Sequence, residues 1–270
     1  MHALGNDFVV IDAITQEVEI TPQRAKTIAD RNTGIGCDQI LIVEPPSNPD
    51  VDFKYRIFNQ DGSEVSQCGN GARCFAKYVI DRKLTGKSTI KVETRAGIME
   101  LMVENNHNYS VAMGIPNFVA ADIPYTGPDS KVQNIEVVDG ESFEFFTLSI
   151  GNPHAVLLVD SVDTAEVERI GKIFQASKHF PESVNVGFME IRSTSEIRLR
   201  VFERGVGETL ACGSGACAAV AAGINNHLLD NSVTVNLPLG KLEIQWPGLG
   251  EQVMLTGPAT TVFNGNIRLR

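Results

Sequence analysis

The 270-residue sequence has a net charge of −10, from 23 Lys and Arg against 33 Asp and Glu, and 43% of its residues are hydrophobic. A chain of this length can bury a large core, and we expect two domains. The acidic balance, without a basic block, argues against nucleic acid and anionic membrane surfaces as partners. There is no apolar run of 18 residues and no signal-peptide pattern, and the five cysteines lack a secreted spacing, so we expect a cytoplasmic protein.

In chain order, the first half is predicted to contain short strands and two helices. Alternating apolar residues indicate the strands, while Thr21-Pro22 and the apolar run after Gly69 indicate helix starts. The strands are expected at 8–12, 39–44, 52–58, 89–94, 98–104 and 109–113, and the helices at about 21–31 and 69–82. Turn residues predict a polar loop at 59–67 and a candidate interdomain linker at 116–128.

The second half shows a similar series. Strands are predicted at 143–150, 155–159, 185–191, 197–202, 233–237, 242–246 and 253–256, and helices at 164–174 and about 213–228. Asp163 is the expected N-cap of the shorter helix, with Glu166 three residues on as in a capping box. Residues 203–211 are expected to form a loop. Because strands do not alternate regularly with helices, each half is predicted to be a mostly antiparallel sheet around one apolar helix, which is an α+β fold.

One motif occurs twice. Cys68-Gly69-Asn70-Gly71-Ala72 is matched 144 positions later by Cys212-Gly213-Ser214-Gly215-Ala216. The match extends upstream without a gap, and seven of the seventeen positions from 56 to 72 carry the same residue in both copies. This self-similarity predicts an internal duplication.

Cys68 and Cys212 stand first in the two motifs, directly before apolar runs with helical spacing. A cysteine at a helix N-terminus lies near unpaired N–H groups and the positive end of the helix dipole, which stabilise a thiolate. Two such cysteines facing each other across a cleft would form a pair of acid and base groups. The alternative is that each is a small buried residue that packs a helix start. The repetition favours the reactive pair.

The residues after each cysteine are candidates for binding an anion. Glycine lets a ligand approach the backbone closely, and exposed N–H groups at Gly69-Asn70 and Gly213-Ser214 could bind a carboxylate or phosphate. A simple transition from loop to helix is the alternative for each motif.

Polar residues also occur at matching places in the two halves. Asn59 precedes Cys68 by nine residues, as Glu203 precedes Cys212, and Gly-Asn pairs carry Asn6 and Asn152. These matches predict one cleft lined from both sides.

Each polar candidate also has a structural alternative. The asparagines, including Asn185, suit turns as well as ligands. Arg204 is either a solvated charge or a bidentate clamp for a carboxylate, and His154 is either a turn residue or part of the site.

Two common kinds of site are not expected. Gly34-Ile35-Gly36 lacks a third glycine and precedes a strand, so it does not form a dinucleotide fingerprint. No Cys-x-x-Cys occurs and no His-x-x-x-His accompanies the cysteines, so we expect no zinc site. Cys37, Cys74 and Cys217 are expected to pack in the interior.

A set of short strings, in the expected order and over essentially the whole chain, resembles the diaminopimelate epimerase family. The strings are Gly5-Asn6-Asp7-Phe8, Gly36-Cys37-Asp38-Gln39, Arg56-Ile57-Phe58-Asn59-Gln60-Asp61-Gly62-Ser63-Glu64, Cys68-Gly69-Asn70-Gly71-Ala72-Arg73-Cys74, Gly151-Asn152-Pro153-His154, Asn185-Val186-Gly187-Phe188, Glu203-Arg204-Gly205 and Ala211-Cys212-Gly213-Ser214-Gly215. The Cys-Gly motif alone would indicate only the wider superfamily. Family members usually carry several residues ahead of Met1, so we expect a shortened first strand.

The resemblance implies two pseudo-symmetric domains, each a curved, mostly antiparallel sheet wrapped around a central helix, with the C-terminal strand returning to the first domain. We expect residues 1–113 and 258–270 to form the domain that carries Cys68, and residues 114–257 the domain that carries Cys212. The implied activity is the interconversion of L,L- and meso-diaminopimelate by one thiolate and one thiol, in lysine biosynthesis. No pyridoxal phosphate, other cofactor or metal is implied. The implied partners are this small-molecule substrate and a second copy of the chain in a homodimer, with no nucleic acid and no membrane.

The resemblance also carries over individual residues. Cys68 and Cys212 match the catalytic thiols, and His154 and Glu203 match assisting groups near the reacting centre. The matched substrate-binding positions are Asn6, Gln39, Asn59, Gly69, Asn70, Asn152, Asn185, Glu203, Arg204, Gly213 and Ser214.

Two alternatives remain at this point. A proline racemase-like enzyme or another isomerase of the same superfamily would share the two-domain plan and, in some members, both cysteines. The set Glu203-Arg204-Gly205, together with the asparagines, favours a substrate with two amino-acid ends. A non-enzymatic anion-binding or thiol-redox protein would exchange no α-protons of a substrate with solvent.

Overall fold

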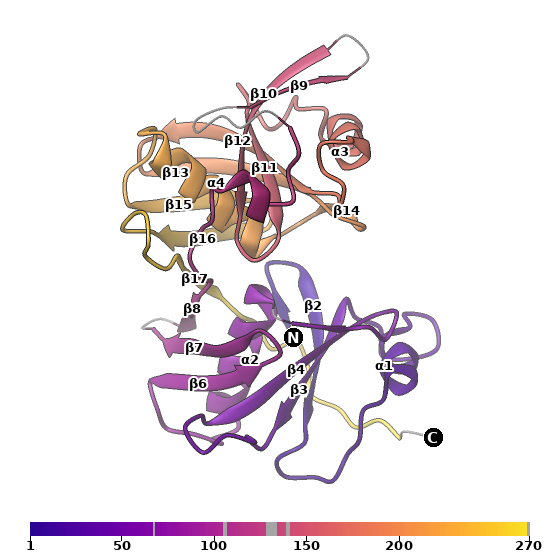
Figure 1. Cartoon of the computed structure of the whole chain (residues 1–270). Helices are drawn as coiled ribbons and strands as arrows, with labels where there is room; N and C mark the ends of the chain where they lie inside the picture. The colour runs from indigo at the N-terminus through magenta and orange to yellow at the C-terminus, as the bar shows by residue number, and fades with distance from the viewer. Residues whose placement is uncertain (67, 105–106, 128–133, 139–140, 269–270) are drawn as a thin grey trace. The chain divides into compact units, whose positions relative to one another are not determined.

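The structure is a computed structural model that describes residues 1–66, 68–104, 107–127, 134–138 and 141–268. The chain divides into two compact units (Figure 1). Unit 1 comprises Met1–Ala112 and Thr256–Arg270, and unit 2 comprises Met113–Leu255. Each unit combines a mixed sheet with helices, so the predicted α+β class is confirmed.

Unit 1 begins with a two-residue strand and contains two helices. The helices are α1 (Pro22–Ala29) and α2 (Gly69–Asp81). The strands are β1 (His2–Ala3), β2 (Asn6–Asp12), β3 (Gln39–Glu44), β4 (Phe53–Asn59), β5 (Glu64–Val65), β6 (Thr89–Thr94), β7 (Gly97–Val103), β8 (Asn108–Ala112) and β17 (Met254–Pro258), which enters the unit at Thr256 and pairs with β8.

Unit 2 contains the helices α3 (Val167–Ala176) and α4 (Gly213–Asn225) and a short 3₁₀ helix, η2 (Ala120–Asp122). Its strands are β9 (Asn134–Val138), β10 (Glu141–Ser149), β11 (Pro153–Leu158), β12 (Asn185–Ser193), β13 (Glu196–Glu203), β14 (Gly207–Thr209), β15 (Ser232–Leu237) and β16 (Gly240–Gln245).

The two sheets share one order of strand pairing. In unit 1, β2 is parallel to β3, β3 is antiparallel to β4, and β4 is antiparallel to β5 and parallel to β6. In unit 2, β11, β12, β13, β14 and β15 make the same pairings in the same order. An antiparallel hairpin follows in each, β6–β7 and β15–β16. The sequence duplication is therefore also a duplication of topology.

A repeated ion pair explains two of the identities between the halves. Arg56 Nε donates to Glu64 at 2.7 Å across β4 and β5, and Arg200 Nε donates to Glu208 at 2.6 Å across β13 and β14. Both pairs are bidentate, since each guanidinium also donates to the second carboxylate oxygen. A bidentate pair fixes geometry as well as charge. Each pair therefore holds the short strand that precedes a motif cysteine.

The sheet of unit 1 lies between its two helices (Figure 1). A Cβ added at Gly71 of α2 would overlap the Tyr55 hydroxyl and lie 3.0 Å from the Leu41 side chain, so these strand residues face α2. Ile40, the neighbour of Leu41, packs instead with Ile28 of α1. Successive strand residues point to opposite faces of a sheet. The two helices therefore cover opposite faces, and α2 is buried along most of its length.

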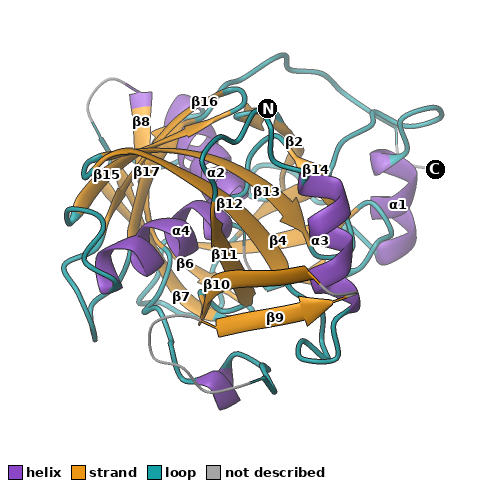
Figure 2. Cartoon of the chain, turned by 90° about the horizontal axis from the view of Figure 1, so that it is seen from above, coloured by secondary structure: helices purple, strands orange, loops and turns teal. Residues whose placement is uncertain are grey.

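The sheet of unit 2 is also covered on both faces (Figures 1 and 2). A Cβ at Gly215 of α4 would lie 3.0 Å from Val201, and one at Gly171 of α3 would overlap the Phe202 ring. Val201 and Phe202 are neighbours in β13, so α4 and α3 lie on opposite faces. Helix α4 is rich in alanine and buried on nearly all sides. Small side chains allow this close approach from several strands.

One predicted helix start is wrong. Helix α3 begins at Val167 and has Glu166 as its N-cap residue, not Asp163. The Asp163 carboxylate is engaged by Arg198 at 2.7 Å instead. An ion pair to the neighbouring strand thus replaces the expected cap.

The predicted linker at 116–128 is also wrong for the residues that the structure describes. The boundary between the units falls at Ala112 and Met113, and Ile123 and Tyr125 are buried in the core of unit 2. The turn-forming residues here bend a segment that packs into the core of unit 2. Pro128 lies outside the described residues.

The strands β5, β9 and β14 were not predicted from the sequence. β5 and β14 lie within the expected loops 59–67 and 203–211, and they span two and three residues. Strands this short show no measurable alternation. Gln67, at the end of the first expected loop, lies outside the described residues.

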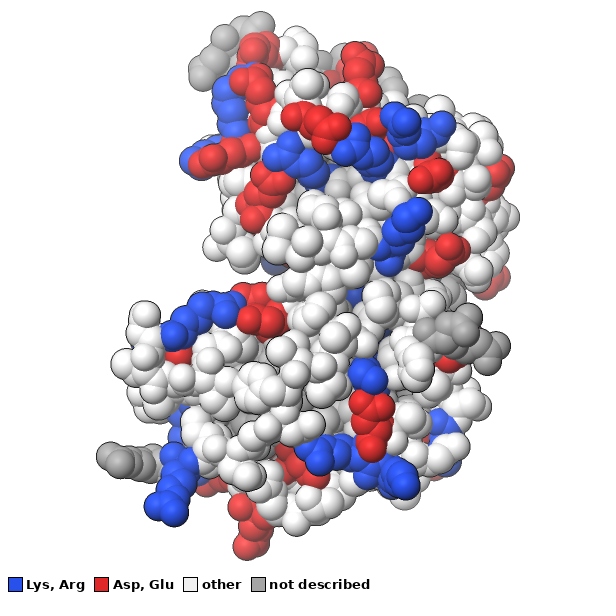
Figure 3. All heavy atoms as spheres, turned by 180° about the vertical axis from the view of Figure 1, so that it is seen from behind, with Lys and Arg blue, Asp and Glu red and all other residues white. Residues whose placement is uncertain are grey.

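Charged residues of both signs are mixed on the face seen in Figure 3, where Lys and Arg lie among Asp and Glu. Within the described ranges, no helix has both the length and the apolar character needed to cross a membrane.

Candidate active site

Both motif cysteines are N-cap residues. Cys68 precedes α2 and its sulfur accepts from the Gly71 N–H at 3.5 Å, while Cys212 precedes α4 and its sulfur accepts from the Gly215 N–H at 3.3 Å. The first four N–H groups of a helix lack intrahelical partners and carry the positive end of its dipole. The fold therefore sets each sulfur beside a cluster of N–H donors.

The residues directly after the cysteines are the first residues of the helices. Gly69 and Gly213 are buried, and the N–H groups of Gly69-Asn70 and Gly213-Ser214 belong to the first helical turn. Such N–H groups are well suited to hold a carboxylate.

In unit 1, Asn6 and Asn70 form an amide pair. Asn70 Nδ2 donates to Asn6 Oδ1 at 3.2 Å, and Asn6 Nδ2 donates to Asp38 Oδ2 at 3.0 Å. Arg31 in turn donates to Asp38 at 2.8 Å and to Asp7 at 2.9 Å. Because a carboxylate can only accept, Asp38 fixes the direction of the Asn6 amide.

Gln39 and Asn59 form a second pair, directly opposite each other on β3 and β4. Gln39 Nε2 donates to Asn59 Oδ1 at 2.9 Å, and Asn59 Nδ2 donates to Ser63 Oγ at 3.1 Å. Gln39 Oε1 is buried and has no hydrogen-bond partner among the described residues. A buried acceptor of this kind is ready for a donor on a ligand, such as an ammonium group.

In unit 2, Asn152 connects His154 to the start of α4. Asn152 Nδ2 donates to Ser214 Oγ at 3.3 Å, and its Oδ1 lies 3.0 Å from His154 Nε2. An amide oxygen can only accept, so His154 Nε2 carries the proton in this contact. Ser214 Oγ also lies 3.6 Å from the Cys212 sulfur. These contacts join the histidine, the asparagine and the second thiol.

His154 is neutral at physiological pH. Its side chain is 1% exposed, and burial, reinforced by the charge of Arg204, lowers its pKa to about 3. A neutral imidazole with one N–H serves here to orient the Asn152 amide.

Glu203 stands beside the second thiol. Burial raises the pKa of Cys212 well above its usual value, and the negative charge of Glu203 raises it further, against smaller opposing effects of Ser214 and the Gly215 N–H. Thr209 Oγ1 donates a short hydrogen bond to Glu203. Cys212 is therefore a protonated thiol near neutral pH, with a carboxylate held in place next to it.

Asn185 and Arg204 are joined through the backbone. Asn185 Nδ2 donates to the Pro153 carbonyl at 3.1 Å, and its Oδ1 accepts from the Arg204 N–H at 2.9 Å. The Arg204 side chain is exposed and donates to the Glu182 carbonyl at 3.0 Å. Asn185 thus fixes the turn that presents both Arg204 and Glu203.

In each unit the predicted residues form short hydrogen-bonded groups, and those that involve Asn70 and Ser214 lie at the helix starts. Those of unit 1 form the pairs Asn6–Asn70 and Gln39–Asn59, while those of unit 2 form a network linked by hydrogen bonds and chain neighbours.

Several residues without a predicted role also contact this arrangement. The Tyr55 hydroxyl donates to the Cys68 carbonyl at 3.4 Å, and Arg73 donates to Asn70 Oδ1 at 3.0 Å. Asp38, Arg31 and Thr209 make the contacts described above. Only Arg73 carried a signal, because it is a charged residue inside an apolar helix. No local sequence pattern indicates a role for the other residues, because their partners come close to them only when the chain folds.

The other cysteines pack in the interior, as expected. Cys37, Cys74 and Cys217 are buried. Burial raises the pKa of Cys74 to about 12 and that of Cys37 to about 11, which leaves both as thiols. Among the described residues, no group of His, Cys, Asp and Glu could hold a metal ion.

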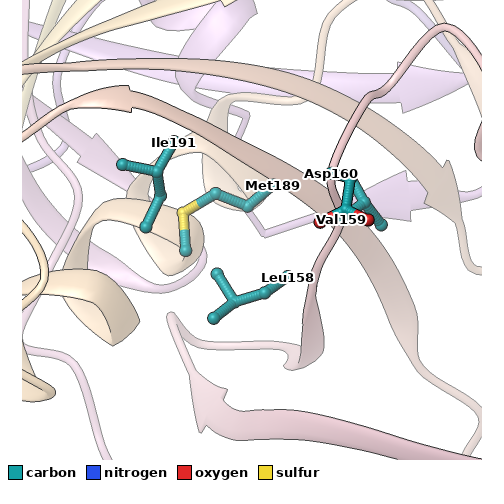
Figure 4. A pocket seen from close by; sticks show the side chains of 5 residues that line it. All are labelled: Leu158, Val159, Asp160, Met189 and Ile191. Atoms are coloured by element: carbon teal, nitrogen blue, oxygen red, sulfur yellow. The ribbon is translucent and has the colours of Figure 1, made fainter.

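A separate depression of about 280 Å³ lies on unit 2 (Figure 4). Leu158, Met189 and Ile191 lie on one side of it, and Val159 and Asp160 complete its lining. None of the predicted site residues lines it, and it offers no thiol or histidine.

The chain matches the family model described as diaminopimelate epimerase over residues 1–119 and 146–262. It is 53% identical to the diaminopimelate epimerase of Ectopseudomonas mendocina and 54% identical to that of Teredinibacter turnerae, in each case over 100% of this chain and 98% of the relative. A solved hydroxyproline epimerase from Agrobacterium vitis is 13% identical with a TM-score of 0.69, over 95% of this chain and 87% of that one, and it shows the same fold. By the family model and the two sequence relatives, the chain belongs to the diaminopimelate epimerase family.

Proposed function

We propose that the protein is a cofactor-independent epimerase that interconverts L,L- and meso-diaminopimelate, with Cys68 and Cys212 as its acid–base pair. The family supplies the substrate. The observation that carries the mechanism is the repeated helix start, in which each unit holds a cysteine sulfur at an N-cap beside first-turn N–H groups.

Inversion of a carbon centre requires removal of a proton on one face and delivery of a proton on the other. A thiolate on the first face forms an S–H bond as the Cα–H bond breaks, and the electron pair is delocalised into the carboxylate. A thiol on the opposite face then gives its proton to the carbon. Two groups in opposite protonation states are therefore needed.

We infer the starting roles from the surroundings of Cys212. Burial and Glu203 raise its pKa, which supports Cys212 as the acid of the first turnover. Cys68 would then be the base that removes the proton. The reverse reaction exchanges the two roles.

The helix starts supply the electrostatic stabilisation. A thiolate is a far weaker base than the carbanion that it forms, and each unit of that pKa mismatch is worth about 1.36 kcal/mol. First-turn N–H groups aimed at the substrate carboxylate stabilise the charge that develops on it in the transition state. Gly69-Asn70 and Gly213-Ser214 are the candidates for this role.

The far end of the substrate is a second amino-acid group. Gln39 offers a buried acceptor suited to an ammonium group, and Arg204 offers an exposed guanidinium suited to a carboxylate. Asn59, Asn185 and Glu203 complete this binding set. Its combination of acceptors and a cation favours diaminopimelate over proline, which has only one such end.

We further expect a cytoplasmic homodimer, with the two units acting as the catalytic domains and with neither nucleic acid nor a membrane as a partner. The net charge of −10 and the absence of a secreted spacing among the five cysteines in the sequence support this setting.

An assay of the purified protein with L,L-diaminopimelate, and with L-proline in parallel, tests the proposal. We expect meso-diaminopimelate to accumulate to equilibrium without added cofactor and proline to remain unchanged. Racemisation of proline without conversion of diaminopimelate would instead indicate a proline racemase-like enzyme. Absence of both reactions would favour a binding or redox protein.

A further inference from the structure

Arg73 is a guanidinium buried inside helix α2. Its side chain is 0% exposed and lies one turn after Cys68, on a helix whose neighbouring residues Cys74 and Phe75 are buried and apolar. Burial of a charge is costly unless hydrogen bonds satisfy it. The oxygen atoms that accept from this guanidinium include Asn70 Oδ1 at 3.0 Å and the carbonyls of Gly69 and Pro258 at 3.3 Å each.

The contact with Asn70 determines the direction of that amide. Arg73 has only donors, so it must meet the Asn70 oxygen, and the Asn70 Nδ2 is left to point the other way. It donates to Asn6 Oδ1 at 3.2 Å, and Asn6 in turn donates to Asp38. The result is a chain of four residues in which the ends, Arg73 and Asp38, fix which way each of the two amides points.

The duplicated half shows that packing does not require a charge at this position. Cys217 occupies the place that corresponds to Arg73, and Ser214 the place of Asn70. There the matching asparagine, Asn152, is oriented by His154 on its oxygen side and by Ser214 on its nitrogen side. Each half therefore has its own device for orienting one asparagine at the start of a helix.

We propose that Arg73 is a positioning residue of the epimerase, which orients the amides of Asn70 and Asn6 toward the substrate and fixes the first turn of α2 against the end of β17. This inference rests on the proposed function, because it assumes that Asn6 and the helix start bind diaminopimelate. Arg73 acts through Asn70 and does not itself touch the substrate.

A double-mutant cycle tests the inference, with variants taken from the duplicated half. Arg73→Met keeps the length of the side chain and removes the donors, and Asn70→Ser copies Ser214. We expect each single variant to raise KM for diaminopimelate by about tenfold, the effect of losing one well-placed hydrogen bond, with kcat changed by less than about threefold. The double variant should raise KM no further than the larger single effect, because both changes break the same chain.

Arg73→Lys keeps the charge and should give a KM between those of the wild type and Arg73→Met. The Lys variant also serves if Arg73→Met does not fold. KM effects that multiply in the double variant, or an Arg73→Met enzyme with lower thermal stability and unchanged KM, would show that Arg73 has only a structural role.

A measurement that does not depend on catalytic activity separates this inference from the proposed function. The side-chain amide resonances of Asn70 and Asn6 in the free protein should shift in Arg73→Met and Arg73→Lys, while those of Asn152 should not. Unchanged resonances of Asn70 and Asn6 would overturn the inference even if the wild type converts diaminopimelate. A wild type that does not convert it, with shifted resonances, would refute the function alone.

Discussion

The two helix starts share a backbone and differ in the charges around them. Both place a cysteine at an N-cap, and both tie an asparagine to the second residue of the helix. In unit 1 the nearby ion is the buried guanidinium of Arg73, whereas in unit 2 it is the carboxylate of Glu203. The duplication thus supplies one geometry twice, and the residues that differ between the copies supply different electrostatics.

This difference bears on a two-base inversion, which needs one acid and one base. Two identical thiols would share one proton equally, whereas different surroundings favour the proton on one of them at rest. A carboxylate beside one thiol raises the pKa of that thiol alone. The halves can therefore begin a turnover with one acid and one base while retaining nearly the same fold.

Removal of either motif sulfur gives the largest expected effect. Cys68→Ala and Cys212→Ala should each lower kcat for epimerisation by at least about a hundredfold, because each deletes an acid–base group. Cys74→Ala and Cys217→Ala are matched controls from the same helices, and they should retain wild-type kcat within about threefold after correction for any unfolded protein. The measurement is conversion of L,L- to meso-diaminopimelate by folded enzyme. A loss shared by all four variants would show that the pair has no special role.

Glu203→Gln removes the charge that distinguishes the second site. We expect kcat/KM to fall by about tenfold or more, and its alkaline limb to move to lower pH. The sign follows because Glu203 raises the pKa of Cys212, and the acid is lost when pH passes that pKa. The pH profile of kcat/KM measures both effects. Glu208→Gln, which removes a carboxylate of the same hairpin that pairs with Arg200, is the control and should leave the limb in place.

His154 makes the stability of the protein depend on pH. Its folded pKa of about 3 lies below the usual value of 6.5, so the unfolded chain binds the proton more readily. The contribution of the neutral His154 ring to the free energy of unfolding is therefore present above pH 6.5. It is lost as pH falls from 6.5 toward 3, by about 2 kcal/mol at pH 5. Urea unfolding at pH 7 and pH 5 should show this loss in the wild type and a smaller loss in His154→Gln. Equal losses in both proteins would mean that His154 is not buried as a neutral ring.

Thr209→Val gives the smallest expected effect. Val65 stands at the corresponding place in the first half, so this variant makes the second half more like the first. It removes the hydroxyl that donates to Glu203, and kcat/KM should fall by about threefold to tenfold. Thr194→Val, which removes a surface hydroxyl that donates to Asp230, is the control. Equal kinetics for the two variants would show that Glu203 does not depend on Thr209.

Local signals in the sequence account for much of the site. The repeated Cys-Gly-x-Gly followed by an apolar run predicts a cysteine at a helix start, because the capping preferences act within a few residues. Alternation along strands places Leu41 and Ile40 on opposite faces. Because both are apolar, the sequence indicates a sheet that is covered on both faces. The resemblance then selected the polar residues, of which Asn6, Asn70, Asn152 and Ser214 are hydrogen-bonded at these helix starts.

Contacts between distant residues account for what was missed. The Pro258 carbonyl that accepts from Arg73 lies 185 residues away in the chain, and no pattern near Arg73 indicates it. Asp163 could cap a helix or pair with Arg198, and the choice depends on a strand 35 residues later. Strands of two or three residues, such as β5, form because the sheet offers them a partner.

Early conversion of L,L-diaminopimelate in heavy water tests the two-thiol account most directly, with the α-deuterium content of product and remaining substrate measured by mass spectrometry. The account predicts meso product that carries one solvent deuterium at the inverted carbon, while the remaining L,L substrate still carries protium. Meso product that retains the original α-proton would show that a single base returns the same proton to the opposite face, and it would contradict the assignment of Cys68 and Cys212 as a pair.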